Sequence, residues 1–110
     1  MTERKLHNPH AGEILKYEFI DEIGISQNAL AKAIKVPANR IHHIIKGVRR
    51  ITADTDLRLC KFFAVSDGYF LRLQSIYETM EAKKELKNKI DSIPLYSVFL
   101  KTHGQYESRL

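Results

Sequence analysis

The chain has 110 residues, of which 44% are hydrophobic and 28% charged, a size and composition typical of one folded domain. No uncharged stretch approaches the length of a membrane-spanning helix, and the N-terminus lacks the apolar run of a secretion signal. The single cysteine excludes an internal disulfide and a thiolate metal cluster. We therefore expect a protein of the reducing cytoplasm that needs no metal and no cofactor.

The net charge of +5 is concentrated in one part of the chain. The segment from Gly24 to Ala53 carries six basic residues and no acidic one, whereas the rest of the chain has 12 basic and 13 acidic residues. A segment without carboxylates presents an unopposed positive field to a polyanion such as nucleic acid. The same pattern is also typical of an ordinary solvated surface, so charge alone leaves both interpretations open.

The spacing of apolar residues predicts an all-α chain, because strand-like alternation is absent. A first helix is expected to start near Ala11, with Leu15, Phe19 and Ile23 on one apolar stripe and Gly24 as its left-handed cap.

Two short helices follow this first one. Ser26 is a good N-cap for a helix that ends at Ile34, and Pro37 is expected to open a third helix that ends at Gly47. Lys35 lies in the turn between them. The apolar residues of the pair are expected to share a core: Leu30, Ala31, Ile34, Ile41, Ile44 and Ile45.

Thr52 and Ser66 are the predicted N-caps of a fourth and a fifth helix. Apolar spacing places Leu57, Leu59, Cys60, Phe63, Phe70, Leu73, Ile76, Tyr77 and Met80 on their buried faces, with Phe62 and Tyr69 also in the core.

The pattern leaves open whether the fifth helix continues through the charged residues 81–89. Regular helix is expected to stop at Ile93-Pro94, because proline lacks an amide proton. We therefore divide the chain into a domain of residues 1–92, with its core at about 9–80, and a C-terminal extension of residues 93–110 with no assigned role.

Residues 27–46 have the layout of a helix-turn-helix, in which a short bracing helix is followed by a helix that exposes polar residues at its N-terminal half. An asparagine there can bond an adenine edge, and Arg40 can reach a guanine or a phosphate. The residues left outside once the isoleucines point inward are Ala38, Asn39, His42, His43 and Lys46.

Over about residues 7–80 the sequence resembles the HigA-type antitoxins of the phage-repressor-like (XRE) helix-turn-helix family. The motifs that carry the resemblance are PHAGEIL at 9–15, ISQNALA at 25–31, VPANRI at 36–41, IKGVRRITADT at 45–55, LRL at 57–59 and FF at 62–63. The chain departs from the family at Ala11, where proline is frequent, at Lys35, where glycine is common, and after Ile93, where no counterpart is recognised.

The resemblance implies a five-helix lambda-repressor-like domain that acts as a homodimer. Its partners would be double-stranded operator DNA at its own promoter and a RelE/HigB-like ribonuclease toxin. The residues expected to hold phosphate are Gln27 and Asn28; those expected at base edges are Asn39, Arg40 and His43, beside Ala38; those expected on the DNA backbone are Lys46, Arg49 and Arg50.

Two surfaces are predicted for protein partners. The apolar fifth helix and Leu95–Leu100 are candidates for the dimer contact. A toxin that binds RNA has a basic surface, so its partner would contact it through carboxylates. The acidic residues outside residues 24–53 form two candidate sets: Glu13, Glu18, Asp21 and Glu22 on the first helix, and Glu78, Glu81 and Glu85 near the end of the fifth. The alternative is that both sets are ordinary solvated helix faces.

Two other functions remain open at this stage. The chain would be a solitary repressor of the same fold if no toxin accompanies it. A nuclease-like enzyme using His42 or His43 is the weaker alternative, because no catalytic motif is present. The missing motifs lead us to expect no enzyme. Adjacent helical residues point about 100° apart and do not easily bind one metal ion, so we expect no metal site at these histidines either.

Overall fold

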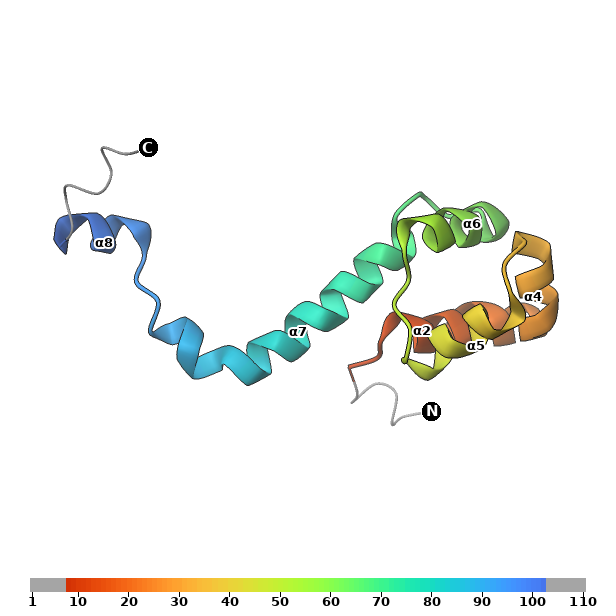
Figure 1. The fold of residues 1–110 in the computed structure, drawn as a ribbon, viewed down its shortest axis with the longest axis horizontal. Helices are drawn as coiled ribbons and strands as arrows, with labels where there is room; N and C mark the ends of the chain where they lie inside the picture. The colour runs from red at the N-terminus through yellow and green to blue at the C-terminus, as the bar shows by residue number, and fades with distance from the viewer. Residues whose placement is uncertain (1–7, 103–110) are drawn as a thin grey trace.

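The computed structural model describes residues 8–102, and the secondary structure of this part of the chain is helix joined by turns and connectors, with no strand. Helices α2 to α6 form a compact bundle, and α7 leaves this bundle as a long arm that ends near α8 (Figure 1). The all-α, five-helix fold predicted from the sequence is confirmed, and α8 is an additional short helix. No helix within residues 8–102 is both long and apolar enough to cross a membrane.

The first predicted helix is one continuous helical rod of three parts. Its parts are α2 (Ala11–Ile14), a π-helix η1 (Leu15–Ile20) and α3 (Asp21–Ile23). His10 caps the start, because its ring accepts the Gly12 amide while the Glu13 carboxylate accepts the His10 amide. Gly24 ends the rod in the left-handed conformation, as predicted.

The π-helical part changes which residues of this rod are buried. In a π-helix residues five apart lie above one another, so Leu15 is aligned with Ile20, and both are buried. Ile23 is turned outward and is 57% exposed. The predicted stripe at four-residue spacing is therefore wrong at its last member.

Helix α4 (Gln27–Ile34) has the predicted bounds, whereas α5 (Ala38–Lys46) begins one residue later than predicted and ends where predicted. The Ser26 side chain accepts the Ala29 amide and so caps α4. Pro37 is not the first residue of α5, because its ψ of 144° is not helical; it is the N-cap that precedes the helix. Gly47 ends α5 with φ of 82°.

Helices α6 (Ala53–Phe63) and α7 (Tyr69–Asp91) are joined by a tight loop. Thr52 caps α6 as predicted, but Ser66 does not cap α7. The N-cap of α7 is Gly68, and the carboxylate of Asp56 on α6 accepts the first free amides of α7. A carboxylate at a helix N-terminus satisfies amides that have no partner within the helix.

The hydrophobic core lies among α2 to α6 and the first two turns of α7. Phe19 contacts the rings of Phe63, Tyr69 and Phe70 at centroid distances of 4.9, 5.8 and 5.1 Å. The fully buried members from the rest of the core are Leu15, Leu30, Ile41, Ile44, Ile51 and Leu59, and Cys60 is buried beside them.

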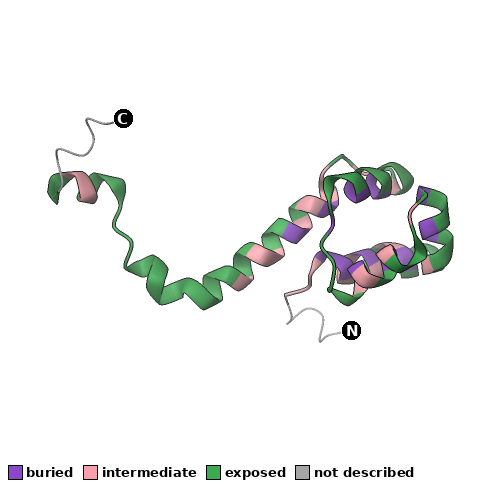
Figure 2. Cartoon of the chain, in the orientation of Figure 1, coloured by how far each residue is buried: buried purple, intermediate pink, exposed green. Residues whose placement is uncertain are grey.

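Four residues predicted to be in the core lie at the surface: Leu57, Phe62, Ile76 and Met80. The first two lie on the outer face of α6. The other two, Ile76 and Met80, lie on the outer side of α7, because the same stretch still contacts the bundle through Tyr77 and Glu78. Figure 2 shows that the C-terminal half of α7, beyond these contacts, is exposed.

α7 continues through residues 81–89 without a break, which settles the question that the sequence pattern left open. The helix stops before Ile93-Pro94, as predicted, and α8 (Tyr96–Thr102) follows. The division at residue 92 stays a prediction, and residues 1–7 and 103–110 of the two predicted parts lie outside the described residues.

Candidate nucleic-acid interface

One face of α5 is polar and turned away from the core. Ile41 and Ile44 are buried, and at about 100° per residue the opposite direction is occupied by Asn39, His43 and Lys46. Asn39 and Lys46 are exposed and His43 is half-buried. We call these three residues the α5 stripe.

Two further predicted residues of α5 flank this stripe. Ala38 is exposed, and its small side chain leaves room for close approach. Arg40 is half-buried, and its Nε atom is shielded from solvent with no hydrogen-bond partner among residues 8–102. The structure therefore brings Asn39 and His43 together and places Arg40 at the edge of the same face.

The N-terminus of α4 lies in the segment that has no acidic residue. Gln27 is half-buried and Asn28 is exposed in the first turn of the helix. Amides at a helix N-terminus and its positive dipole end attract a phosphate, and no carboxylate in this turn opposes that attraction. The contact of Gln27 and Asn28 with a phosphate stays a prediction.

The turn between α4 and α5 is fixed by a left-handed residue. Lys35 adopts φ of 64°, a conformation that costs a non-glycine residue about 1 kcal/mol. The Arg58 guanidinium on α6 donates to the carbonyls of Ile34 and Lys35 at 2.9 and 3.3 Å. These bonds hold the C-terminus of α4 and so help to set the angle between the two helices.

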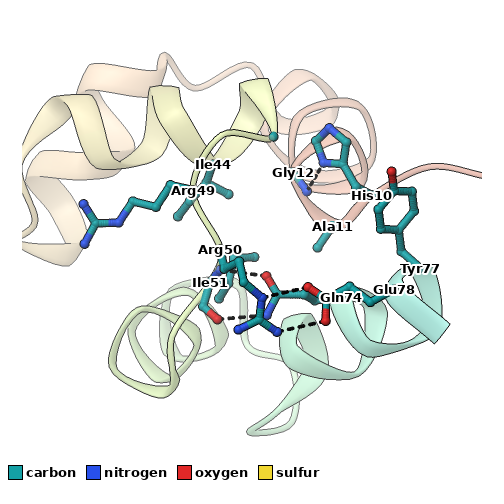
Figure 3. A pocket seen from close by; sticks show the side chains of 11 residues that line it. His10, Ala11, Gly12, Ile44, Arg49, Arg50, Ile51, Gln74, Tyr77 and Glu78 are labelled. Carbon is teal, nitrogen blue, oxygen red and sulfur yellow. Dashed lines mark hydrogen bonds and ion pairs between the residues drawn. The ribbon is translucent and has the colours of Figure 1, made fainter. Parts of the chain in front are cut away.

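Three basic residues follow at the end of α5 and in the connector to α6. Lys46 and Arg49 are exposed, and their side chains form no hydrogen bond or ion pair with residues 8–102. Arg50 instead forms a two-point ion pair with Glu78 on α7, with Nε–Oε2 of 2.7 Å and Nη2–Oε1 of 2.9 Å (Figure 3). The hydrogen bond from Arg50 holds the pKa of Glu78 below its ordinary value.

α2 supports α5 from behind the polar face. Gly12 lies directly against the backbone carbonyl of Ile44, so closely that a Cβ at this position has no space. The His10 ring lies edge-on to Tyr77 of α7, with 5.9 Å between ring centroids. The start of the N-terminal rod, α2, therefore packs against both α5 and α7 (Figure 3).

The histidines of α5 do not form a metal site in the described part of the chain. The rings of His42 and His43 are 6.1 Å apart, and no group of three histidine, cysteine or acidic residues within residues 8–102 is placed to hold a metal ion.

Sequence reasoning missed three residues that join distant segments of the chain. Asp56, Gln74 and Glu78 each bond a segment at least 12 residues away in the sequence. Gln74 and Asp56 were not singled out for such a role because no local pattern marks a bond between distant helices. Glu78 was expected to be a surface carboxylate for a protein partner.

A short bracing helix, a left-handed turn and a second helix with a bare polar face define the architecture of a helix-turn-helix protein. The helix-turn-helix family matches residues 15–70. Virulence-associated protein I of Dichelobacter nodosus is 40% identical over 86 residues, which are 78% of this chain and 80% of that protein.

Two solved structures are similar over their whole length. A HigA-family addiction module antidote protein from Coxiella burnetii has a TM-score of 0.75 and 41% identity over 82% of this chain and 99% of its own. The antitoxin HigA of Pseudomonas aeruginosa, solved with the higBA promoter, has a TM-score of 0.75 and 36% identity over 82% of this chain and 99% of its own. The chain belongs to the helix-turn-helix family and, within it, to the HigA-type group that its motifs resemble.

Proposed function

We propose that the chain is a sequence-specific DNA-binding antitoxin of a type II toxin–antitoxin module. It represses its own promoter and neutralises a RelE/HigB-like ribonuclease toxin in the cytoplasm. The observation that carries the proposal is the α5 stripe, a polar face opposite a buried isoleucine face, in a segment with six basic residues and no acidic one. The relative solved with promoter DNA has the same fold, which supports this function.

In this proposal α5 enters the major groove. Asn39 and His43 lie on base edges, with Arg40 beside them at the rim of the groove and Ala38 allowing close approach. Gln27 and Asn28 hold a phosphate at the N-terminus of α4. Lys46 and Arg49 contact the backbone beyond the groove.

The Asn39→Ala variant is expected to bind promoter DNA about 10- to 100-fold more weakly, with little change on a random duplex, because a bidentate base contact discriminates by about 1–3 kcal/mol. Lys46→Ala should weaken both duplexes alike and reduce the salt slope by about one. Fluorescence anisotropy on a duplex from the promoter of the chain's own gene, across a salt series, measures both effects.

Lys61→Ala is the matched control, because Lys61 is exposed on α6 and outside the proposed interface. It should change neither the ratio of the affinities for promoter and random DNA nor the salt dependence of binding appreciably. If Asn39→Ala and Arg40→Ala weaken promoter and random DNA to the same extent as Lys46→Ala does, base recognition by α5 is refuted.

A homodimer is part of the proposal, because one helix-turn-helix reads too few base pairs to select a site in a genome. The exposed half of α7 carries Met80 and Ile90 at 48% and 45% exposure, and the stems of Lys83 and Lys87 lie between them at coiled-coil spacing. Leu95 and its neighbours in α8 add exposed apolar surface. We assign the dimer contact to this surface.

Ile90→Glu is expected to convert a dimer into a monomer at micromolar concentration, because a charge is placed in the apolar contact. Asn88→Glu adds the same charge on another face of α7 and should leave the dimer intact. Analytical ultracentrifugation distinguishes the two variants. A wild-type chain that sediments only as a monomer, with or without DNA, contradicts the dimer.

The toxin contact is proposed on carboxylates outside the DNA face. Each acidic set has one exposed member whose side chain forms no hydrogen bond or ion pair within residues 8–102: Glu22 on α3 and Glu85 on α7. Other members are already engaged, as Asp21 is by Lys16 at 2.9 Å. Complementary charge would orient a basic toxin without covering α5.

We expect the product of the neighbouring gene to copurify with this chain and to stop inhibiting growth when both are expressed. Glu22→Lys or Glu85→Lys should then weaken the complex by like-charge repulsion. A pull-down and a growth assay report these effects. If the two proteins do not associate, the chain is a solitary repressor; if neither charge reversal matters, the toxin binds elsewhere.

A further inference from the structure

The connector between α5 and α6, residues 47–52, is held to α7 by two pairs of hydrogen bonds. The Gln74 side chain accepts the Ile51 amide at 2.7 Å and donates to the Ile51 carbonyl at 2.9 Å. Gln74 is only 8% exposed and Ile51 is 2% exposed. The second pair is the two-point contact of Arg50 with Glu78. We call these four residues the α7 clamp.

Each half of the α7 clamp is a two-point contact, which fixes the orientation of a group as well as its distance. Arg49 precedes the clamped residues and extends away from Glu78, whereas Arg50 turns toward it (Figure 3). The two arginines point to different sides of the connector, so holding Arg50 and Ile51 in place also restricts the direction of Arg49.

An alternative role for Arg50 is a direct contact with phosphate, as the sequence predicts. That contact would bring the Glu78 carboxylate, which is within 3 Å of the guanidinium, toward the DNA backbone as well. A carboxylate and a phosphate held by the same guanidinium repel each other. The pKa of Glu78 is lowered by Arg50, so the carboxylate stays ionised at neutral pH and the repulsion persists.

We propose that Glu78 and Gln74 are positioning residues for the DNA interface, which hold Arg50 and Ile51 so that Arg49 meets the DNA backbone. Arg50 belongs to the α7 clamp and is not itself a phosphate contact. The inference rests on the proposed function, because Glu78 and Gln74 can position Arg49 for DNA only if the chain binds DNA through this face.

The test is a double-mutant cycle on the full chain with the promoter duplex. Arg49→Ala should weaken binding about tenfold, as the loss of one charge-assisted contact does. Glu78→Gln should weaken it to a similar extent, and Arg49→Ala should add little in the Glu78→Gln background. The Arg50→Glu/Glu78→Arg double variant should recover most of the wild-type affinity, because the ion pair is restored in reverse.

Asp67→Asn is the matched control, since it removes one exposed negative charge outside the clamp and reports the general effect of charge on DNA affinity. Thermal unfolding by circular dichroism establishes that every variant is folded at the temperature of the assay. If Glu78→Gln unfolds, the Arg50→Glu/Glu78→Arg double variant still tests the inference, because it keeps the ion pair.

Three results would overturn the inference. If Glu78→Gln tightens binding and steepens the salt slope, Arg50 is a phosphate contact that Glu78 restrains. If Glu78→Gln and Arg49→Ala weaken binding independently, or Glu78→Gln lowers the melting temperature with no effect on DNA, the clamp only stabilises the fold. A wild-type chain that does not prefer promoter over random DNA would instead refute the proposed function.

Discussion

Gly12→Ala should lower the free energy of unfolding by about 3 kcal/mol, although alanine is the better helix former. In an unobstructed helix the substitution would stabilise the protein by up to about 1 kcal/mol. Here the added methyl group meets the backbone carbonyl of Ile44, which cannot rotate away as a side chain would. Overpacking of this kind costs about 1–3 kcal/mol and occasionally more.

Helix propensity and overpacking predict opposite signs for the change in the free energy of unfolding of Gly12→Ala, so the measurement distinguishes them clearly. Urea unfolding of Gly12→Ala and wild type gives the difference directly, and promoter binding should fall with it, because α2 would push α5 out of position. Gly24→Ala is a useful comparison: nothing lies within 4 Å of its Cβ, so only the left-handed backbone costs free energy, about 1 kcal/mol. A stabilised Gly12→Ala variant would show that α2 and α5 are further apart than described.

Features set by local sequence were predictable. Ser26 and Thr52 cap their helices, and Gly24 and Gly47 end theirs, because each of these roles needs one residue type at one place. A turn at Lys35 was predictable from its place between two short helices, but its left-handed conformation was suggested only by the glycine that is common there in the family that the sequence resembles. The α5 stripe follows from the spacing of the isoleucines.

Features set by distant contacts were not predictable from one sequence. The π-helical part of the N-terminal rod has no residue type that marks it, so the burial of Ile20 instead of Ile23 appears only in the structure. The capping of α7 was assigned to Ser66 because serine is a common N-cap, while the actual acceptor lies on another helix. Arg50 looked like a free cation because its partner is 28 residues away.

That distant acceptor, Asp56, carries the last prediction: Asp56→Ala should lower the free energy of unfolding by about 3 kcal/mol. The side chain is 1% exposed, and its two oxygens accept the amides of Gly68, Phe70 and Leu71 at 2.7, 2.9 and 3.1 Å. A hydrogen bond to a charged group contributes about 1.5–3 kcal/mol, and a buried amide left without an acceptor adds a desolvation cost. Alanine removes all three acceptor contacts at once.

Asp54 provides the matched control on the same turn of α6. Its carboxylate is 62% exposed and pairs with Arg58 four residues later, so Asp54→Ala should cost no more than about 1 kcal/mol. Both carboxylates interact with the dipole of α6, and the difference between the variants therefore isolates the capping of α7. Chemical denaturation of the two variants measures this difference. Equal losses would mean that Asp56 acts only through its own helix; a larger loss for Asp56→Ala, with faster amide exchange at Phe70, would place its effect at the start of α7.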